Sequence, residues 1–440
     1  MADPKRTQLS VRRERAVLVG VLLPGQNAEW PEPLAELAAL ATTAGARVVD
    51  RVIQKRSRIS SALYIGRGKA GEIADRVELH DADVIIFDND LSPGQIGGLE
   101  DHTKTKVIDR SELILDIFAT RAQTREARLQ VELAQLQYTY PRLTRMWSHL
   151  DRLEGGGALG IGTRGPGEQQ LEIDRRLVQK RLADLRQKIK QIEQRKSRQV
   201  HARADQFTVS LVGYTNAGKS TLMNALTGAG TKVEDKLFAT LDTKTRRWDL
   251  DDGQVALLSD TVGFVRDLPH HLVASFRATL EEATHAALLI HVVDASNPQV
   301  MQQCDAVENV LRELDCEDSP RLTVLNKVDL ETDPTLHTLL EQRYPGALRV
   351  SAATGRGLTD LVAAAHQICS GSMIELNVRI HSGAGKALSY LAEHGNVLER
   401  TYEDDFVRLR VILSKHDHEA IRRNGIWKNI EYLDLQAEDS

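Results

Sequence analysis

The chain has 440 residues, of which 41% are hydrophobic and 27% are charged, and its formal net charge is −5. This length suits about three domains with separate cores. The net charge by itself argues against a nucleic-acid binder, and apolar runs of about eight residues exclude a membrane-spanning helix. Cys304, Cys316 and Cys369 lack paired metal-ligand spacing, so we expect reduced, buried thiols in a cytoplasmic protein.

Residues 1–122 are expected to form an N-terminal α/β domain. The apolar run AVLVGVLL at 16–23 follows VRRER and imitates a signal peptide, but PGQNAEWPEP replaces a cleavage site, which favours a buried strand. Further strand patterns lie at 47–53 and 82–88, with a helix pattern at 33–45. This alternation predicts a small parallel α/β unit.

The stretch YIGRGKAGEI at 64–73 leaves two interpretations open. Its glycines and lysine could serve a second nucleotide site. It lacks the full spacing of a phosphate loop and follows no convincing buried strand, so we favour an ordinary loop that enters a helix.

Residues 123–200 carry 16 Lys and Arg against 9 Asp and Glu, a local charge of +7 in an acidic protein. Such an asymmetry is typical of a polyanion-binding segment, although a solvated helix face would look the same. Two heptad-like stripes predict two long helices packed antiparallel, the first kinked at Pro141. The stripes are Leu129, Leu133, Leu136, Tyr140, Leu143, Trp147 and Leu150, then Val178, Leu182, Leu185, Ile189 and Ile192.

A glycine-rich loop, EGGGALGIGTRGPGEQQLE at 154–172, joins these helices. Its glycines allow a backbone to approach another molecule closely, and Thr163 and Arg164 add hydrogen-bond donors. A basic hairpin with such a tip is suited to structured RNA. The alternative is a mere connector.

Residues 205–370 contain TVSLVGYTNAGKST at 208–221, a strand that runs into a GxxxxGK[ST] loop and then a helix. Gly213 and Gly218 let the loop wrap around a β-phosphate. Lys219 is expected to reach the β- and γ-phosphates, and Ser220 to bind magnesium.

Guanine specificity is predicted from NKVD at 326–329, which follows the apolar strand 321–325. The Asp329 carboxylate can accept from both donors of guanine, a pattern that adenine lacks. Asn326 and Lys327 would brace this loop, and SAATGRG at 351–357 would supply backbone N–H groups to the base.

Two further segments should respond to the terminal phosphate. Asp260 would hold Mg²⁺ through water, and the N–H group of Gly263 would contact the γ-phosphate. The first switch is expected in LFATLD at 237–242, where Thr240 would complete the magnesium shell beside Ser220.

Thr243 and Thr245 compete with Thr240 for that assignment. Asn216 sits where some similar GTPases place a potassium ligand, and the alternative is that it braces the loop. The expected catalytic set is Lys219, Thr240 and Gly263. The expected nucleotide-contacting residues are Gly213, Tyr214, Thr215, Asn216, Ala217, Gly218, Lys219, Ser220, Thr221, Phe238, Ala239, Thr240, Leu241, Asp242, Asp260, Thr261, Val262, Gly263, Asn326, Lys327, Val328, Asp329, Ser351, Ala352 and Ala353.

Phe264 follows DTVG, where Ras-like enzymes carry the glutamine that orients the attacking water. A phenyl ring cannot do this, so we expect slow intrinsic hydrolysis and strong stimulation by a partner. The alternative is that Phe264 packs the switch while another side chain, such as one near Thr240 or His270, substitutes.

Residues 371–440 are expected to form a small C-terminal α+β domain that serves docking or packing. Strict alternation at 374–380 and 407–413, with 396–403 between them, indicates an antiparallel sheet with helices near 384–394 and 416–424.

The motifs GTRGPGEQQLEIDRR, VGYTNAGKST, LFATLD, DTVGFVRDLP and NKVD, in this order, resemble the HflX family of ribosome-associated GTPases. The resemblance covers nearly all of 16–370 and is less distinctive beyond it. Thr243 departs from the family, which commonly has proline after LFATLD, and could loosen the first switch.

The resemblance implies a multidomain α/β fold, GTP and GDP as ligands, and Mg²⁺ with K⁺ as a further option. It implies that the partner is the large ribosomal subunit, contacted through ribosomal RNA by the hairpin and loop 154–172. It also implies that stalled or idle ribosomes are split in the GTP state. We expect a monomer that binds neither DNA nor a membrane.

Two other functions compete with this hypothesis. A stand-alone P-loop kinase or ATP-driven RNA remodeller conflicts with NKVD and SAA, which specify guanine. A GTP-switched scaffold would bind a protein through the heptad helices, and its binding would be insensitive to salt and to Arg164→Ala.

Overall fold

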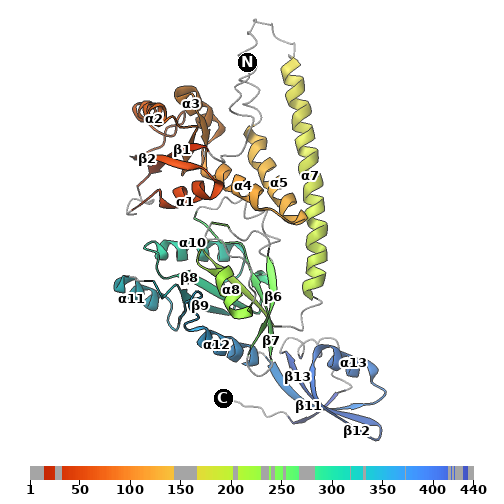
Figure 1. The fold of residues 1–440 in the computed structure, drawn as a ribbon. Coiled ribbons are helices and arrows are strands. Elements are labelled where there is room, and N and C mark those ends of the chain that lie inside the picture. The colour runs from red at the N-terminus through yellow and green to blue at the C-terminus, as the bar shows by residue number, and fades with distance from the viewer. Residues whose placement is uncertain are drawn as a thin grey trace.

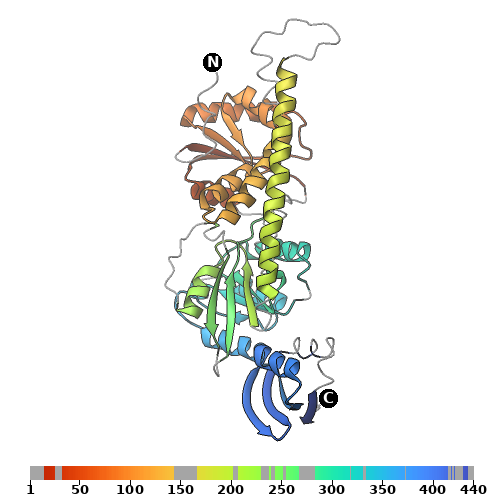
Figure 2. The same cartoon turned by 90° about the vertical axis from the view of Figure 1, so that its right-hand side faces the viewer.

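The computed structural model describes most of the chain. The described residues are 14–24, 32–142, 166–201, 207–228, 237–238, 243–250, 254–266, 283–317, 319–330, 333–371, 373–414, 418, 421 and 430–434. Figures 1 and 2 show three sheet-containing units stacked along one axis, with the long helix α7 (Pro166–His201) running beside the first two. The multidomain α/β architecture expected from the sequence is confirmed.

The first unit contains a four-stranded parallel sheet in the order β2-β1-β3-β4. Alternate residues of β1 face opposite sides, so α1 and α4 cover one face and α2 and α3 cover the other. The bounds are β1 Arg15–Leu22, α1 Ala35–Ala44, β2 Arg47–Lys55, α2 Arg67–His80, β3 Val84–Phe87, α3 Pro93–Thr103, β4 Lys106–Ile108 and α4 Arg110–Arg121.

Local chemistry sets the helix ends in this unit. Gly45 ends α1 with φ 94°, a left-handed conformation that glycine adopts without steric cost. Ser92 and Gln95 form a capping box at the start of α3, and Pro93 occupies its first turn. The 64–73 stretch enters α2 at Arg67, which confirms a loop that leads into a helix.

The helix α5 (Arg125–Thr139) packs along α7. Their contact is a leucine-rich cluster drawn from both predicted stripes, namely Leu129, Leu133, Leu136, Val178, Leu182, Leu185 and Ile189. The regular α-helix is interrupted at Pro141, because α5 ends at Thr139 and Tyr140–Arg142 form a 3₁₀ turn; a kink of a longer helix would involve residues from 143 on, which lie outside the described residues. The outer part of the first stripe, from Leu143, and most of loop 154–172 lie outside the described residues.

The second unit has a six-stranded sheet in the order β10-β9-β8-β5-β7-β6, in which only β6 runs antiparallel to its neighbour. Its described elements are β5 Phe207–Gly213, α8 Lys219–Thr227, β6 Lys244–Asp249, β7 Val255–Asp260, β8 Leu288–Asp294, α10 Val300–Glu313, β9 Arg321–Asn326, α11 Pro334–Arg343, β10 Leu348–Arg349 and α12 Leu358–Gly371.

The third unit is an antiparallel sheet in the order β12-β13-β11-β14 with α13 packed on it. The bounds are β11 Met373–His381, α13 Gly385–His394, β12 Asn396–Glu403, β13 Phe406–Ser414 and β14 Ile430–Asp434. Its antiparallel sheet and its helix agree with the α+β prediction, and its hydrophobic core contains residues of this unit alone. Among the described residues of the whole chain, no helix combines the length and apolar character needed to cross a bilayer.

One hydrophobic core crosses the boundary between the first two units. It joins residues of α1, α4 and α5 to Val212, Tyr214, Phe238, Val262 and Phe264 of the second unit. The turns at the end of the second sheet are therefore packed directly against the first unit.

Candidate functional site

The loop between β5 and α8 is shaped by two glycines with positive φ. A Cβ atom on Gly213 (φ 151°) would lie 2.3 Å from the carbonyl oxygen of Val292. A Cβ atom on Gly218 (φ 95°) would lie 2.3 Å from Nδ2 of Asn326. No other residue fits either position, so the loop wraps tightly before α8 begins at Lys219.

Lys219 is buried inside this loop. Its Nζ donates to the carbonyl oxygens of Gly213 at 3.0 Å and Tyr214 at 2.9 Å. Burial lowers the pKa of the Lys219 ammonium to about 8, although Asp260 opposes the shift. A desolvated ammonium inside a loop of backbone dipoles is suited to an anionic ligand.

Ser220 and Asp260 bring two oxygen donors together. The Ser220 hydroxyl donates to Oδ2 of Asp260 at 2.6 Å, and Asp260 is fully buried at the end of β7. The next residue, Thr261, donates its hydroxyl to the carbonyl of Leu211 at 2.6 Å and ties this strand end to β5. A hydroxyl and a carboxylate are ligands that Mg²⁺ prefers.

The turn after β7 packs on residues 213–221 between β5 and α8, which we call the phosphate-type loop. A Cβ atom on Gly263 would lie 2.6 Å from Cα of Thr215 and 3.0 Å from Nζ of Lys219, so only glycine fits. The N–H group of Thr215 donates to the carbonyl of Phe264 at 2.7 Å, and the N–H group of Phe264 donates to the carbonyl of Gly213 at 3.2 Å.

Phe264 contributes its backbone to this contact and not its side chain. The residue is 1% exposed, and its ring is part of the core shared by the first two units. Packing by Phe264, one of the alternatives open from the sequence, is therefore observed. His270, the other candidate for orienting water, lies outside the described residues.

Asn326 connects three loops at the same end of the sheet. Its Nδ2 donates to the carbonyl of Ala217 at 2.9 Å, and its Oδ1 accepts from the N–H group of Ala352 at 3.0 Å. Lys327 donates to Oδ2 of Asp294 at 2.7 Å. Asp329 is exposed at the rim of this arrangement.

Sequence comparison with known proteins decides the family. The protein named GTPase HflX from Lacrimispora saccharolytica is 45% identical over 402 residues, covering 90% of this chain and 93% of that protein. This chain belongs to the HflX family of GTPases. The GTPase HflX of Escherichia coli (strain K12) is 42% identical over 396 residues, which cover 89% of this chain and 91% of that protein.

Four family models match successive parts of this HflX chain. They are GTP-binding GTPase N-terminal at 31–119, GTP-binding GTPase middle region at 121–203, 50S ribosome-binding GTPase at 208–327 and HflX C-terminal domain at 340–432. A solved GTP-binding protein of Sulfolobus solfataricus in complex with GDP is 23% identical, with a TM-score of 0.42 over 81% of this chain and 99% of that one. This chain is a GTP-binding, GTP-hydrolysing enzyme.

The expected site residues of this HflX protein come together where the structure describes them. The loop at 213–221, the turn at 260–263, and the segments 326–329 and 351–353 meet at the carboxyl ends of β5, β7 and β9. Phe238 joins them through a hydrogen bond from its N–H group to the Thr215 hydroxyl. Ala239, Thr240, Leu241 and Asp242 lie outside the described residues.

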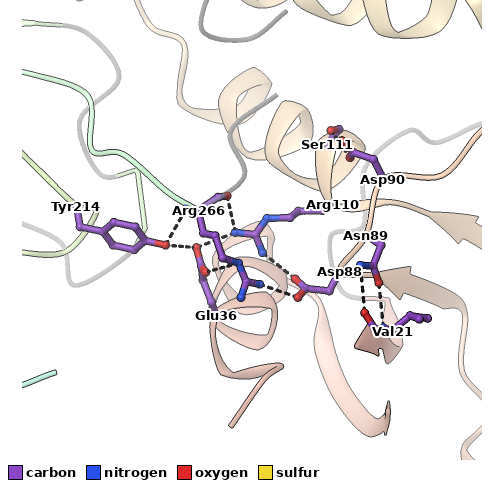
Figure 3. A network of polar contacts seen from close by, with 9 residues as sticks. All are labelled: Val21, Glu36, Asp88, Asn89, Asp90, Arg110, Ser111, Tyr214 and Arg266. Atoms are coloured by element: carbon purple, nitrogen blue, oxygen red, sulfur yellow. Dashed lines mark hydrogen bonds and ion pairs between the residues drawn. The ribbon is translucent and has the colours of Figure 1, made fainter. Parts of the chain in front are cut away.

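A charged network between the first two units of this chain was not among the sequence-based predictions (Figure 3). Arg110 at the start of α4 bonds Glu36 of α1 and Asp88 after β3, each at 2.7 Å. Arg266, after DTVGFV, bonds the same Asp88 at 2.7 Å. Tyr214 of the phosphate-type loop donates its hydroxyl to Glu36 at 2.6 Å and accepts from the N–H group of Arg266 at 2.8 Å.

All members of this network have low exposure, so their charges compensate one another in a region with little water. Burial opposes ionisation of Glu36, but Arg110 and Arg266 outweigh it and lower the pKa of that carboxyl group. A signal was visible in the sequence, because Tyr214 lies within VGYTNAGKST and Arg266 lies within DTVGFVRDLP. Their acidic partners could not be found without the fold.

A cavity of about 520 Å³ opens beside the network. It lies between α1, the phosphate-type loop and the start of α10, and its polar lining includes Glu32, Glu36, Asn216, Asp294 and Gln303. Asn216 has a left-handed backbone conformation, with φ 60°. Its side chain is exposed and lines this cavity.

Proposed function

We propose that this HflX GTPase hydrolyses GTP slowly alone, binds the large ribosomal subunit, and is stimulated by it in order to split or rescue stalled and idle ribosomes. The observation that carries the proposal is the burial of Phe264. With its ring in the core, Phe264 offers only its backbone to the phosphate-type loop, as far as the described residues of this turn, 261–266, show. A partner that completes the active site can be worth 10³–10⁵ in rate.

The contacts of the described residues support the following chemistry at the site. Gly213 to Thr221 would surround the phosphates, with Lys219 neutralising charge on the β- and γ-phosphates. The N–H group of Gly263 would contact the γ-phosphate. Asp329 and the 351–353 backbone would select guanine, with Asn326 fixing the two loops relative to each other.

The oxygen donors fit a magnesium ion. Ser220 and the buried Asp260 already meet at 2.6 Å. Ser220 and, in the GTP state, Thr240 are the proposed direct protein ligands, and Asp260 would hold the ion through water. Mg²⁺ would neutralise charge that develops on the terminal phosphates. Potassium near Asn216 remains a second proposed cation, supported by the exposure of that side chain.

The ribosomal partner is supported by the family description of 208–327 as a 50S ribosome-binding GTPase. It is also supported by the surface of α7, where basic side chains are exposed at Arg175, Arg176, Lys180, Arg186 and Lys190. Phosphate contacts of this kind position a protein on RNA. We assign the hairpin 123–200 and its loop 154–172 to ribosomal RNA, between an N-terminal domain at 1–122, a GTPase domain at 205–370 and a C-terminal domain at 371–440.

The test is steady-state GTP hydrolysis with Mg²⁺ and K⁺, with and without purified large ribosomal subunits. We expect stimulation by orders of magnitude. A matched variant with GGGALGIGTRGPG shortened should keep intrinsic hydrolysis and lose the stimulation. Fast hydrolysis alone, or a rate that the subunit leaves unchanged, would contradict the proposal.

A further inference from the structure

A pair of phenylalanines connects the first unit to the nucleotide-binding unit. Phe118 lies on α4, and Phe238 lies at the start of LFATLD. Their ring centroids are 4.6 Å apart at an interplanar angle of 74°, an edge-to-face contact. Each residue is 1% exposed, so the contact is fully shielded from water.

The backbone of Phe238 is in a conformation that needs support from its surroundings. Its φ is 55°, in the left-handed region that bulky residues rarely adopt. Such a conformation persists only where neighbouring contacts over-determine it. The ring contact with Phe118 is one of these contacts, because it fixes the side chain from the opposite unit.

The N–H group of Phe238 holds the phosphate-type loop. It donates to Oγ1 of Thr215 at 2.9 Å, and this bond is buried. Thr215 in turn lies against Gly263, since a Cβ atom there would approach Cα of Thr215 to 2.6 Å. The chain of contacts therefore runs from Phe118 through Phe238 and Thr215 to the turn that carries Gly263.

We propose that Phe118 is a positioning residue for the phosphate-binding loop, that it acts through Phe238, and that it favours binding of the triphosphate over the diphosphate. This proposal rests on the proposed role of Gly263 and Lys219 at the γ-phosphate. Thr215 lies against Gly263 and therefore borders the proposed position of the γ-phosphate. A less firmly held Thr215 should weaken contacts with the γ-phosphate more than contacts with the phosphates beside Gly218.

Simple core packing would produce a different pattern. If Phe118 only filled space, its replacement would lower stability and would weaken GDP and GTP binding equally. Phe87 provides the matched control, because it is a fully buried phenylalanine of the same unit. It packs on the other face of the sheet, in a cluster made only of first-unit residues.

The experiment compares Phe118→Leu and Phe87→Leu in the full-length chain, with binding of GDP and of a non-hydrolysable GTP analogue measured by fluorescence. For Phe118→Leu we expect the dissociation constant of the GTP analogue to rise about two- to tenfold, the range of one aromatic contact, while that of GDP stays within about twofold. Phe87→Leu should leave the ratio of the two constants unchanged. Equal ratios in both variants, or equal losses for GDP and GTP analogue, would overturn the proposal.

Phe238→Leu tests the same contact from its other side and keeps the question answerable if Phe118→Leu folds poorly. The double variant should shift the ratio no further than either single variant, because both changes remove one interaction. If the shift in the double variant equals the sum of the two single shifts, Phe118 does not act through Phe238.

Lys219→Ala separates the two hypotheses. If it binds both nucleotides like the wild type, the proposed phosphate site is wrong. If it loses binding while Phe118→Leu keeps the wild-type ratio, only the positioning role is wrong.

Discussion

The hydroxyl of Tyr214 donates a 2.6 Å hydrogen bond to Glu36 across the boundary between the nucleotide-binding unit and the first unit. Burial raises the pKa of Tyr214 well above its ordinary value, so the phenol keeps its proton and remains a donor. The same oxygen accepts from the N–H group of Arg266. One side chain of the phosphate-type loop is therefore bonded to both the first unit and the segment after DTVG.

Tyr214→Phe keeps the ring and removes both hydrogen bonds. We expect a loss of about 1–2 kcal/mol in the stability of the contact between the two units, because the Glu36 carboxylate keeps its bond from Arg110 but loses the one from the hydroxyl, and the N–H group of Arg266 loses its bond to the same hydroxyl. Chemical denaturation of the full-length chain, followed by fluorescence, measures this loss. Tyr402→Phe, on an exposed side chain of β12, is the control and should change nothing. A Tyr214→Phe midpoint equal to that of the wild type would show that water replaces the hydroxyl.

Arg110→Met should be more damaging than Tyr214→Phe. It leaves the carboxylates of Glu36 and Asp88 in a buried site with only Arg266 to compensate them, and uncompensated buried charge costs about 3–5 kcal/mol. The thermal midpoint of the full-length chain measures the effect.

Adding Asp88→Asn to Arg110→Met should recover part of the lost stability, because it removes one of the two buried carboxylates that have lost their bond to Arg110. A double variant that is less stable than Arg110→Met alone would mean that Asp88 is stabilised chiefly by Arg266.

Local signals explain why much of the fold was predictable. Apolar runs and their breakers located β1, β2 and β3, and the phosphate-loop motif requires its own strand and helix on either side. Pro141 was a useful local signal as well, because the regular α-helix is interrupted around this proline.

The contacts between units could not be predicted in this way. The bond between Arg110 and the carbonyl of Arg266 joins residues 156 positions apart, and no periodicity encodes such a pair. The sequence shows that Phe264 lacks an amide. Only the fold shows that its ring enters the core shared with α4.

Glu112 should make stability depend on pH. Burial, with a contribution from Asp109, raises the pKa of this carboxyl group to about 7 from an ordinary value of 4.5. As pH rises from 4.5 to 7, the unfolded chain loses this proton before the folded chain does, so folding stability falls across that window and is constant above it. Glu112→Gln removes this dependence.

Between pH 5 and pH 7.5 the Glu112→Gln variant should therefore gain roughly 2–3 kcal/mol relative to the wild type. Denaturation midpoints at several pH values give the difference directly. Glu78→Gln, on an exposed position of α2, is the matched control and should follow the wild type. Parallel curves for Glu112→Gln and wild type would mean that Glu112 is ionised in the folded protein.

Lys219 should take up a proton when a nucleotide binds in mildly alkaline solution. With a pKa of about 8, much of the Lys219 side chain is the neutral amine at pH 8.5. The phosphates of GDP raise this pKa again, because they favour the charged ammonium form. Calorimetric titration with GDP at pH 8.5, in buffers of different ionisation enthalpy, measures the uptake. Lys219→Arg supplies the control, because arginine is already protonated and its binding should involve no such uptake. Buffer-independent binding heats in the wild type would mean that Lys219 is fully charged before GDP arrives, and that the carbonyls of Gly213 and Tyr214 offset its burial completely.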